Sequence, residues 1–112
     1  MRTKTLWIKE EYLQFILDGQ KTVEVRVAYK NIARLRAGDR LLLNDRHPFL
    51  IRCVTRYADF AELLADQDPS SIAPGLSGDA LLVALRRLYP PEKEALGVVA
   101  LEIAPEEAGT DG

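Results

Sequence analysis

The sequence predicts a single small α+β domain in which a mostly antiparallel, partly open β-barrel is flanked by helices. Its 112 residues can bury only one hydrophobic core, and 47% of them are apolar. About five short segments have the apolar or alternating composition of strands, with helical patterns between them. Short strands around a shared core, with helices at the open ends, are typical of small barrels. A single open sheet covered by helices is the competing architecture.

The first half of the chain alternates between strand and helix patterns. Residues 4–8 are rich in aromatic and β-branched side chains, as in a strand, and residues 9–18 carry apolar side chains at helical spacing. Gly19 follows them, where a helix commonly needs a left-handed cap. Residues 22–27 alternate strictly, with three valines on one side and Thr22, Glu24 and Arg26 on the other. This strand is therefore half-buried, and its polar face carries charges of both signs.

The remaining elements complete the predicted domain. After a helical turn at 32–35 and a tight turn at 37–40, residues 41–43 form an apolar strand, and 49–57 return as its antiparallel partner. Helices are expected at 60–65, capped by Asp59, and at 79–88, where leucines line one face. Residues 66–78, rich in turn formers, make the long loop between them. The last strand covers 96–103, so that residues 1–104 are the domain and 105–112 a disordered acidic tail.

Composition limits the classes of function. No apolar run approaches the ~20 residues of a membrane helix, so no membrane span is expected. The N-terminus lacks the apolar stretch of a secretion signal, which makes the cytoplasm the default location. The one cysteine, Cys53, excludes an internal disulfide and is expected to be a buried thiol. With His47 as the one histidine, soft ligands are too few for zinc, and we expect no metal or other cofactor.

Charge is distributed unevenly, although the net charge is only −2. Residues 1–60 contain 12 Lys and Arg against 7 Asp and Glu, whereas residues 61–112 contain 3 against 10. A basic half can supply a local positive surface for nucleic acid even in an acidic protein. The alternative is that these charges only solvate the surface.

Residues 19–26 concentrate the candidate chemistry. Lys21 precedes the alternating strand, and Glu24 and Arg26 lie two residues apart on its polar face. Burial of unpaired charge is costly, so three charged side chains that converge beside a core need a ligand or one another. Two interpretations follow: a binding or reactive site, or ion pairs of Glu24 on a solvated face. Burial beside Arg26 would also turn Lys21 into a base or nucleophile.

The same segment resembles the motif of a known family. The ASCH family, related to PUA-type RNA-binding barrels, has the signature G-x-K-x-x-E-x-R, and the chain matches each fixed position: Gly19, Lys21, Glu24 and Arg26. The similarity covers about residues 4–104, including the turn at 37–39, the helix start at 57–60, the late helix ending at 89–90 and the closing strand. The resemblance implies a PUA-like barrel whose cleft, lined by the motif, suits RNA or a nucleoside.

Proteins of this family differ in activity. Many are inferred to bind RNA, some relatives cleave RNA, and a compact bacterial branch hydrolyses the acetyl amide of N4-acetylcytidine with a Lys, a Thr and a Glu. Lys21 matches that Lys, whereas Glu24 stands where the branch has its Thr. The late helix offers Asp79 or Ala80 in place of the Glu. The loss of the hydroxyl nucleophile argues against an identical mechanism.

The leading prediction is a module that binds RNA, a nucleotide or a nucleoside, with Lys21 and Arg26 on phosphate or base edge and Glu24 accepting hydrogen bonds. One alternative is a small amidohydrolase or ribonuclease with Lys21 and Glu24 as its catalytic pair. Another is a protein-interaction module, which the acidic second half keeps open. Trp7 and Tyr57 could stack a base, although core or half-buried packing is the better interpretation for Trp7, and residues 29–31 could make an exposed backbone contact. The expected ligand-binding residues are Lys21, Thr22, Glu24, Arg26, Asn44 and Tyr57.

Overall fold

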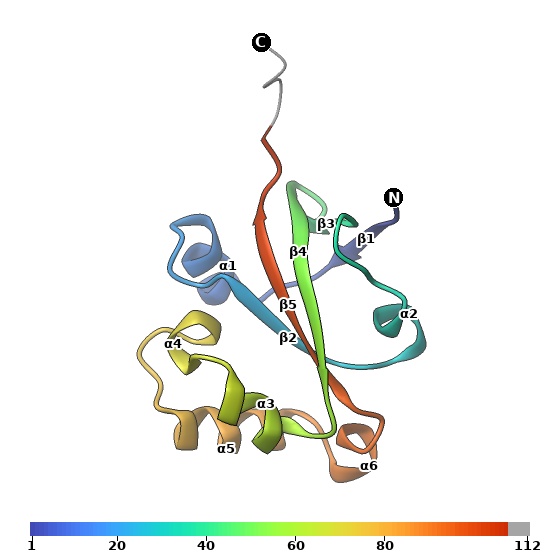
Figure 1. Ribbon diagram of the computed structural model, residues 1–112. Coiled ribbons are helices and arrows are strands. Elements are labelled where there is room, and N and C mark those ends of the chain that lie inside the picture. Colours follow the sequence, from blue (N-terminus) through green and yellow to red (C-terminus); the bar gives the residue numbers. More distant parts are fainter. Residues whose placement is uncertain (108–112) are drawn as a thin grey trace.

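A five-stranded sheet that curls into a half-barrel forms the centre of the protein (Figure 1). The computed structural model describes residues 1–107 of the chain. β1 and β3 pair in parallel, and every other pair is antiparallel. The strand order β1-β3-β4-β5-β2 leaves β1 and β2 at the two edges of the sheet. The strands are β1 (Thr3–Leu6), β2 (Val23–Val27), β3 (Arg40–Leu43), β4 (His47–Tyr57) and β5 (Val98–Pro105).

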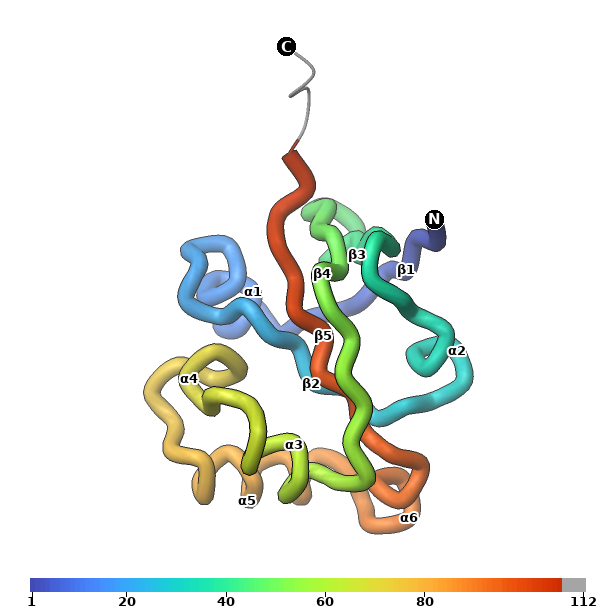
Figure 2. Tube along the Cα trace, in the orientation of Figure 1, coloured from blue at the N-terminus to red at the C-terminus, as the bar shows by residue number. Residues whose placement is uncertain are grey.

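Two groups of helices cover the sheet. Within residues 1–107 the helices are α1 (Glu10–Leu17), α2 (Lys30–Ala33), α3 (Phe60–Asp66), α4 (Pro69–Ile72), α5 (Gly78–Leu88) and α6 (Pro91–Glu94). α1 and α2 bury one apolar cluster with the sheet, which includes Leu41 and Leu101. α3, α4 and α5 gather at one end of the sheet and bury a second cluster around Val27 and Phe60 (Figure 2). None of these helices is long and apolar enough to cross a membrane.

The predicted fold class and the alternating strand are confirmed. Val23, Val25 and Val27 of β2 are all buried in the second cluster, while Glu24 and Arg26 project from the other side of the strand. Gly19 has φ +87°, the left-handed conformation expected where α1 ends. Local sequence signals therefore suffice to place the strand that carries the charged motif.

The chain is more ordered around the predicted loop and tail than the sequence indicates. Residues 66–78 contain α4, because Asp68 accepts a hydrogen bond from Ser70 N and Pro69 occupies the first turn. β5 runs to Pro105, and Glu106 pairs with Arg40 of β3 at 2.7 Å. The beginning of the predicted 105–112 tail is thus fixed to the sheet, and residues 108–112 lie outside the described residues.

Two side chains lie differently from expectation. Cys53 is exposed, and the prediction of a buried thiol is wrong. A β-bulge between Ile51 and Cys53 adds a residue to β4, which shifts the alternation and turns the thiol outward. Trp7 follows the last residue of β1 and is 68% exposed, so its predicted core or half-buried packing is also wrong.

Candidate functional site

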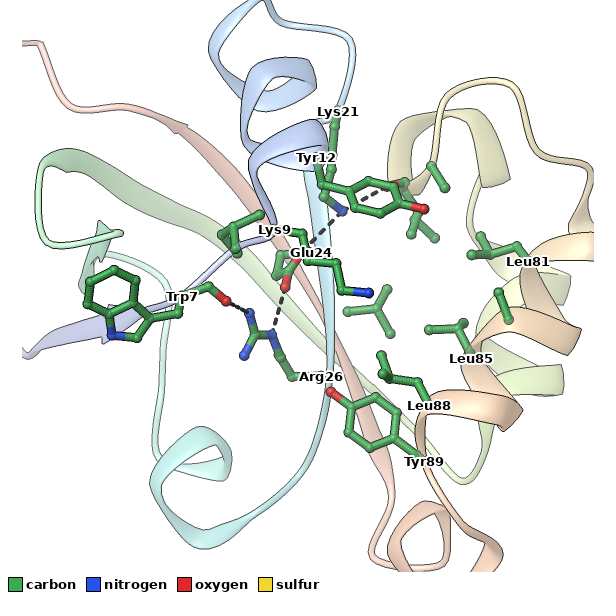
Figure 3. A pocket seen from close by; sticks show the side chains of 15 residues that line it. Trp7, Lys9, Tyr12, Lys21, Glu24, Arg26, Leu81, Leu85, Leu88 and Tyr89 are labelled. Atoms are coloured by element: carbon green, nitrogen blue, oxygen red, sulfur yellow. Dashed lines mark hydrogen bonds and ion pairs between the residues drawn. The ribbon is translucent and has the colours of Figure 1, made fainter.

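A pocket of about 340 Å³ opens beside the edge strand β2, between α1 and α5 (Figure 3). One wall is charged, and the opposite wall is the apolar face of α5, with α4 closing one end. Aromatic rings complete the rim. The lining consists of Trp7, Ile8, Lys9, Tyr12, Lys21, Glu24, Val25, Arg26, Ile72, Ala73, Leu81, Ala84, Leu85, Leu88 and Tyr89.

Lys21 is buried at the inner end of the charged wall and is 4% exposed. The turn after α1 holds its backbone, since Lys21 N donates to Phe15 O at 3.0 Å. Its Nζ donates to Val23 O at 2.6 Å and to Ile72 O at 2.7 Å, and it lies 3.1 Å from Glu24 Oε1. An ammonium group has three N–H donors, so these three acceptors use all of them. Lys21 therefore positions Glu24 and supplies positive charge, but it has no donor left for a ligand.

Glu24 lies at the centre of the charged wall and is 8% exposed. Lys21 holds Oε1, and Arg26 Nε donates to Oε2 at 2.6 Å. Both partners are side chains of the same motif, and each carboxylate oxygen keeps a second lone pair. The predicted ion pairs of Glu24 thus form, but in a buried cleft rather than on a solvated face.

Arg26 and Lys9 are the cations that remain available to a ligand. Arg26 spans from Glu24 to Trp7, whose backbone oxygen accepts from its second nitrogen at 3.0 Å. These two bonds leave three of its five guanidinium N–H groups for other acceptors. Lys9 extends across the pocket toward α5 (Figure 3), and it forms no ion pair with any carboxylate of residues 1–107.

The electrostatics of the pocket favour an anion. Its lining carries three cations, Lys9, Lys21 and Arg26, against one carboxylate, Glu24. Burial lowers the pKa of Lys21 below its ordinary value; Glu24 opposes this shift and Arg26 adds to it. Burial also raises the pKa of Tyr89, whose phenolic hydroxyl can donate a hydrogen bond.

The structure brings together three of the predicted site residues, Lys21, Glu24 and Arg26, and places the other three elsewhere. Thr22 is exposed outside the pocket lining, where its backbone bonds to Ser71 O and Ile103 N. The Asn44 amide accepts from Ile8 N at 2.6 Å and donates to Ile8 O at 2.9 Å, so it fixes the chain after β1.

Tyr57 also lies apart from the pocket, at the end of β4. Its hydroxyl bonds to Asp66 and accepts from Gln67 at 2.8 Å, and its ring packs against the second apolar cluster. The contacts of Asn44 and Tyr57 are therefore those of residues that stabilise the fold.

Sequence reasoning missed Lys9, Tyr12, Tyr89 and the α5 wall. Leu81, Leu85 and Leu88 have the helical spacing of a face that packs in the core. The same three side chains also line the pocket, which this spacing does not reveal. Asp79, which could have supplied a second carboxylate, is exposed and does not line the pocket. Among residues 1–107 no three His, Cys, Asp or Glu side chains come together as a metal site requires.

Comparisons with known proteins agree with this fold. The family model of the ASCH domain matches residues 6–107, which is nearly the whole chain. The crystal structure of the hypothetical protein PH0355 superposes with a TM-score of 0.87 at 27% identity, over 95% of this chain and 100% of that one. The solution structure of PF0455 from Pyrococcus furiosus gives a TM-score of 0.78 at 28% identity, over 96% of this chain and 99% of that one. No curated protein matches the sequence.

Proposed function

The chain belongs to the ASCH domain family, and from this premise we propose that its pocket binds one nucleotide of an RNA. A volume of about 340 Å³ lies near the lower end of the ~300–1,000 Å³ range of ligand pockets, which suits one base with its ribose. The pocket combines an apolar wall, aromatic rings and a positive rim, which are the features that single-stranded RNA sites use.

The observation that best supports this proposal is the buried carboxylate of Glu24, which two cations hold in place and which faces the apolar wall of α5. A base that enters between Tyr12 and Leu85 would lay its faces on apolar groups and turn its edge to the carboxylate. The second lone pairs of Glu24 accept N–H groups of a base edge, and its clamped geometry costs no reorganisation on binding.

In this proposal Arg26 and Lys9 bind the phosphate of the nucleotide. Arg26 keeps three N–H groups, and Lys9 keeps its whole ammonium group, at the open side of the pocket. Charge-assisted bonds to phosphate are about twice as strong as neutral ones. Lys21, whose donors are all used, is in this proposal the residue that positions Glu24 and does not contact the phosphate.

The decisive experiment compares the same substitution at two equally buried carboxylates. Glu24→Gln and Glu94→Gln each remove one charge from a side chain in a residue that is 8% exposed, but only Glu24 lines the pocket. Isothermal titration with the four ribonucleoside 5′-monophosphates should show affinity falling by roughly 10-fold or more in Glu24→Gln, since hydrogen bonds to a charged group are worth ~1.5–3 kcal/mol. Glu94→Gln should bind like the wild type. Equal affinities in all three proteins, or no binding by the wild type, would contradict the proposal.

The phosphate contact has its own test in the salt dependence of RNA binding. A contact to single-stranded RNA contributes about −0.7 to the slope of log affinity against log salt concentration. Lys9→Gln should make that slope shallower by about 0.7. Arg52→Gln removes an exposed charge of β4 that does not line the pocket, and it should leave the slope unchanged.

A second candidate is hydrolysis of the acetyl amide of N4-acetylcytidine, which the lowered pKa of the buried Lys21 beside Glu24 favours. Glu24 would take a proton from water as it attacks the acetyl carbon, and Arg26 would stabilise the oxyanion. Glu24 would then return this proton to N4 as the C–N bond breaks, which releases acetate and cytidine. Against this candidate, Thr22 lies outside the pocket and α5 offers it no carboxylate.

Chromatography of cytidine released from N4-acetylcytidine tests this second candidate directly. Release that Glu24→Gln abolishes and Glu94→Gln does not would support it, whereas release no faster than in Glu24→Gln would rule it out. If the wild type neither binds nucleotides nor turns over this nucleoside, the protein-interaction alternative takes precedence.

A further inference from the structure

A second pocket of about 250 Å³ adjoins the first. The two pockets share Trp7, Arg26 and Tyr89 as lining residues. The second pocket lies between β1 and the segment that runs from β2 into α2. Its other lining residues are Lys4, Thr5, Leu6, Val27, Tyr29, Asn31 and Ile32.

Exposed aromatic rings flank this second pocket. Trp7 holds Arg26 through its backbone oxygen and is 68% exposed as a residue, and its indole lies beyond Arg26, on the side away from α5 (Figure 3). Tyr29 is 38% exposed, and Lys93 Nζ lies 5.8 Å from the centre of its ring. Because every base has a π-face, exposed rings beside a positive groove are suited to stacking successive bases of a single strand.

The charge of the second pocket also fits a nucleic-acid strand. Lys4 and Arg26 are its charged lining residues, and no carboxylate belongs to the lining among the described residues. Arg26 stands between the two pockets with three N–H groups that the protein does not use. A phosphodiester that joins two nucleotides has its anionic oxygens where such a bridging guanidinium would meet them.

We infer that the second pocket holds the nucleotide next to the one in the first pocket, so that the ligand is a single-stranded RNA segment rather than a free nucleotide. This inference rests on the proposed function and extends it from one nucleotide to two. The first pocket reads one base through Glu24, Arg26 holds the linking phosphate, and Tyr29 and Trp7 stack the neighbouring base.

The test measures what the second nucleotide adds. Isothermal titration of the full chain compares the ribonucleoside 5′-monophosphates with the 5′-phosphorylated dinucleotides of A, C, G and U. A stacked base is worth ~1–3 kcal/mol, so the best dinucleotide should bind roughly 5- to 150-fold more tightly than its mononucleotide. A dinucleotide with one abasic ribose separates stacking from the extra phosphate, and it should lose most of this gain. Trp7 is the one tryptophan of the chain, and quenching of its emission should accompany dinucleotide binding.

Tyr29→Ala is the matched variant, because Tyr29 lines the second pocket and not the first. It should remove most of the dinucleotide gain and leave mononucleotide affinity and thermal stability unchanged. Equal binding of mono- and dinucleotides by the wild type, or a gain that survives Tyr29→Ala, would overturn this inference while the proposed function stands. Binding of neither ligand would refute both.

Discussion

Glu24 and Glu94 are equally buried carboxylates, each 8% exposed and each paired with an arginine. Glu94 accepts from the backbone N of Phe60 at 2.9 Å, where α3 begins, and its partner Arg86 is half exposed at 47%. Glu24 accepts from two side chains of its own motif, and it lines a pocket.

The difference lies in what each carboxylate would leave unpaired if it were removed. Without Glu94, a backbone donor at the start of a helix loses its partner, so the role of Glu94 is explained by the fold alone. Without Glu24, the groups that lose a partner are the side-chain cations of Lys21 and Arg26 rather than a backbone group. Burial of a carboxylate is thus a poor guide to function, whereas burial against cations at a cavity is a good one.

The largest effect is expected from Lys21→Met, which removes the cation of the Glu24 cluster. Val23 O and Ile72 O would lose a donor in a buried place, and Glu24 would keep only Arg26. Unpaired buried polar groups cost ~1–3 kcal/mol each, so the free energy of unfolding should fall by at least about 3 kcal/mol. Urea denaturation measures the change. A loss below about 1 kcal/mol would show that water replaces the ammonium group at little cost.

Glu94→Ala should cost less and leave the pocket intact. Phe60 N would be left unpaired in the core, which predicts a loss of about 1–3 kcal/mol in the free energy of unfolding. The nucleotide affinity, measured at a temperature where the variant is folded, should equal that of the wild type. A weakened affinity would mean that α3 and α5 transmit the change to the pocket. Glu94 would then contribute to binding as Glu24 does, and the contrast between the two carboxylates would fail.

Arg26→Lys and Arg86→Lys compare the two arginines in the same way. Arg26 holds Glu24 and Trp7 O at once, and a lysine has no planar fork to reach both. We expect nucleotide affinity to fall about 5- to 10-fold, which corresponds to one charge-assisted hydrogen bond or less. Arg86→Lys should leave it unchanged in the same titration. Equal losses in both variants would point to a general effect of surface charge.

The sequence predicts much of the surroundings of Glu24 and little of the surroundings of Glu94. The alternation of residues 22–27 places Glu24 and Arg26 together on one face, because strand periodicity is a local property. Glu94 gives no such signal, since its partner Phe60 is 34 residues away. The sequence does not predict the Lys9 side of the pocket either, because that side depends on how α1 and α5 pack beside β2.

The surroundings of Cys53 and Asn44 depend on contacts that no side-chain pattern indicates. Cys53 is turned outward by a bulge, and no side-chain pattern indicates where a strand takes an extra residue. Asn44 has the left-handed backbone of a turn, φ 51°, and its polar side chain fits a cleft as well as a turn. The side-chain amide of Asn44 bonds to the backbone of Ile8 because the fold brings Ile8 next to it.

The smallest effect concerns how stability depends on pH. It distinguishes Lys21, which pairs with Glu24, from Arg86, which pairs with Glu94. Burial lowers the pKa of Lys21 from 10.5, whereas the cation that pairs with Glu94 belongs to an arginine, a residue type that is not deprotonated in proteins. Between the lowered pKa and 10.5 the unfolded chain binds more protons at Lys21 than the folded chain does. The free energy of unfolding therefore gains a contribution that rises with pH in this window, by at most about 1.4 kcal/mol per pH unit for one proton. Below the window both states are protonated, and the contribution is constant.

The measurement is the difference in the free energy of unfolding between wild type and Lys21→Met, from urea titrations at several pH values up to 10.5. Burial raises the pKa of Tyr57 and Tyr89, which gives a slope of the opposite sign above pH 10, but both proteins share it and it cancels in the difference. The difference should rise toward alkaline pH, while that between wild type and Arg86→Met, a variant that introduces no titratable group, should stay flat. A flat difference for Lys21 as well would mean that Glu24 fully compensates the burial of its cation, and the motif would then be as inert to pH as the Glu94 pair.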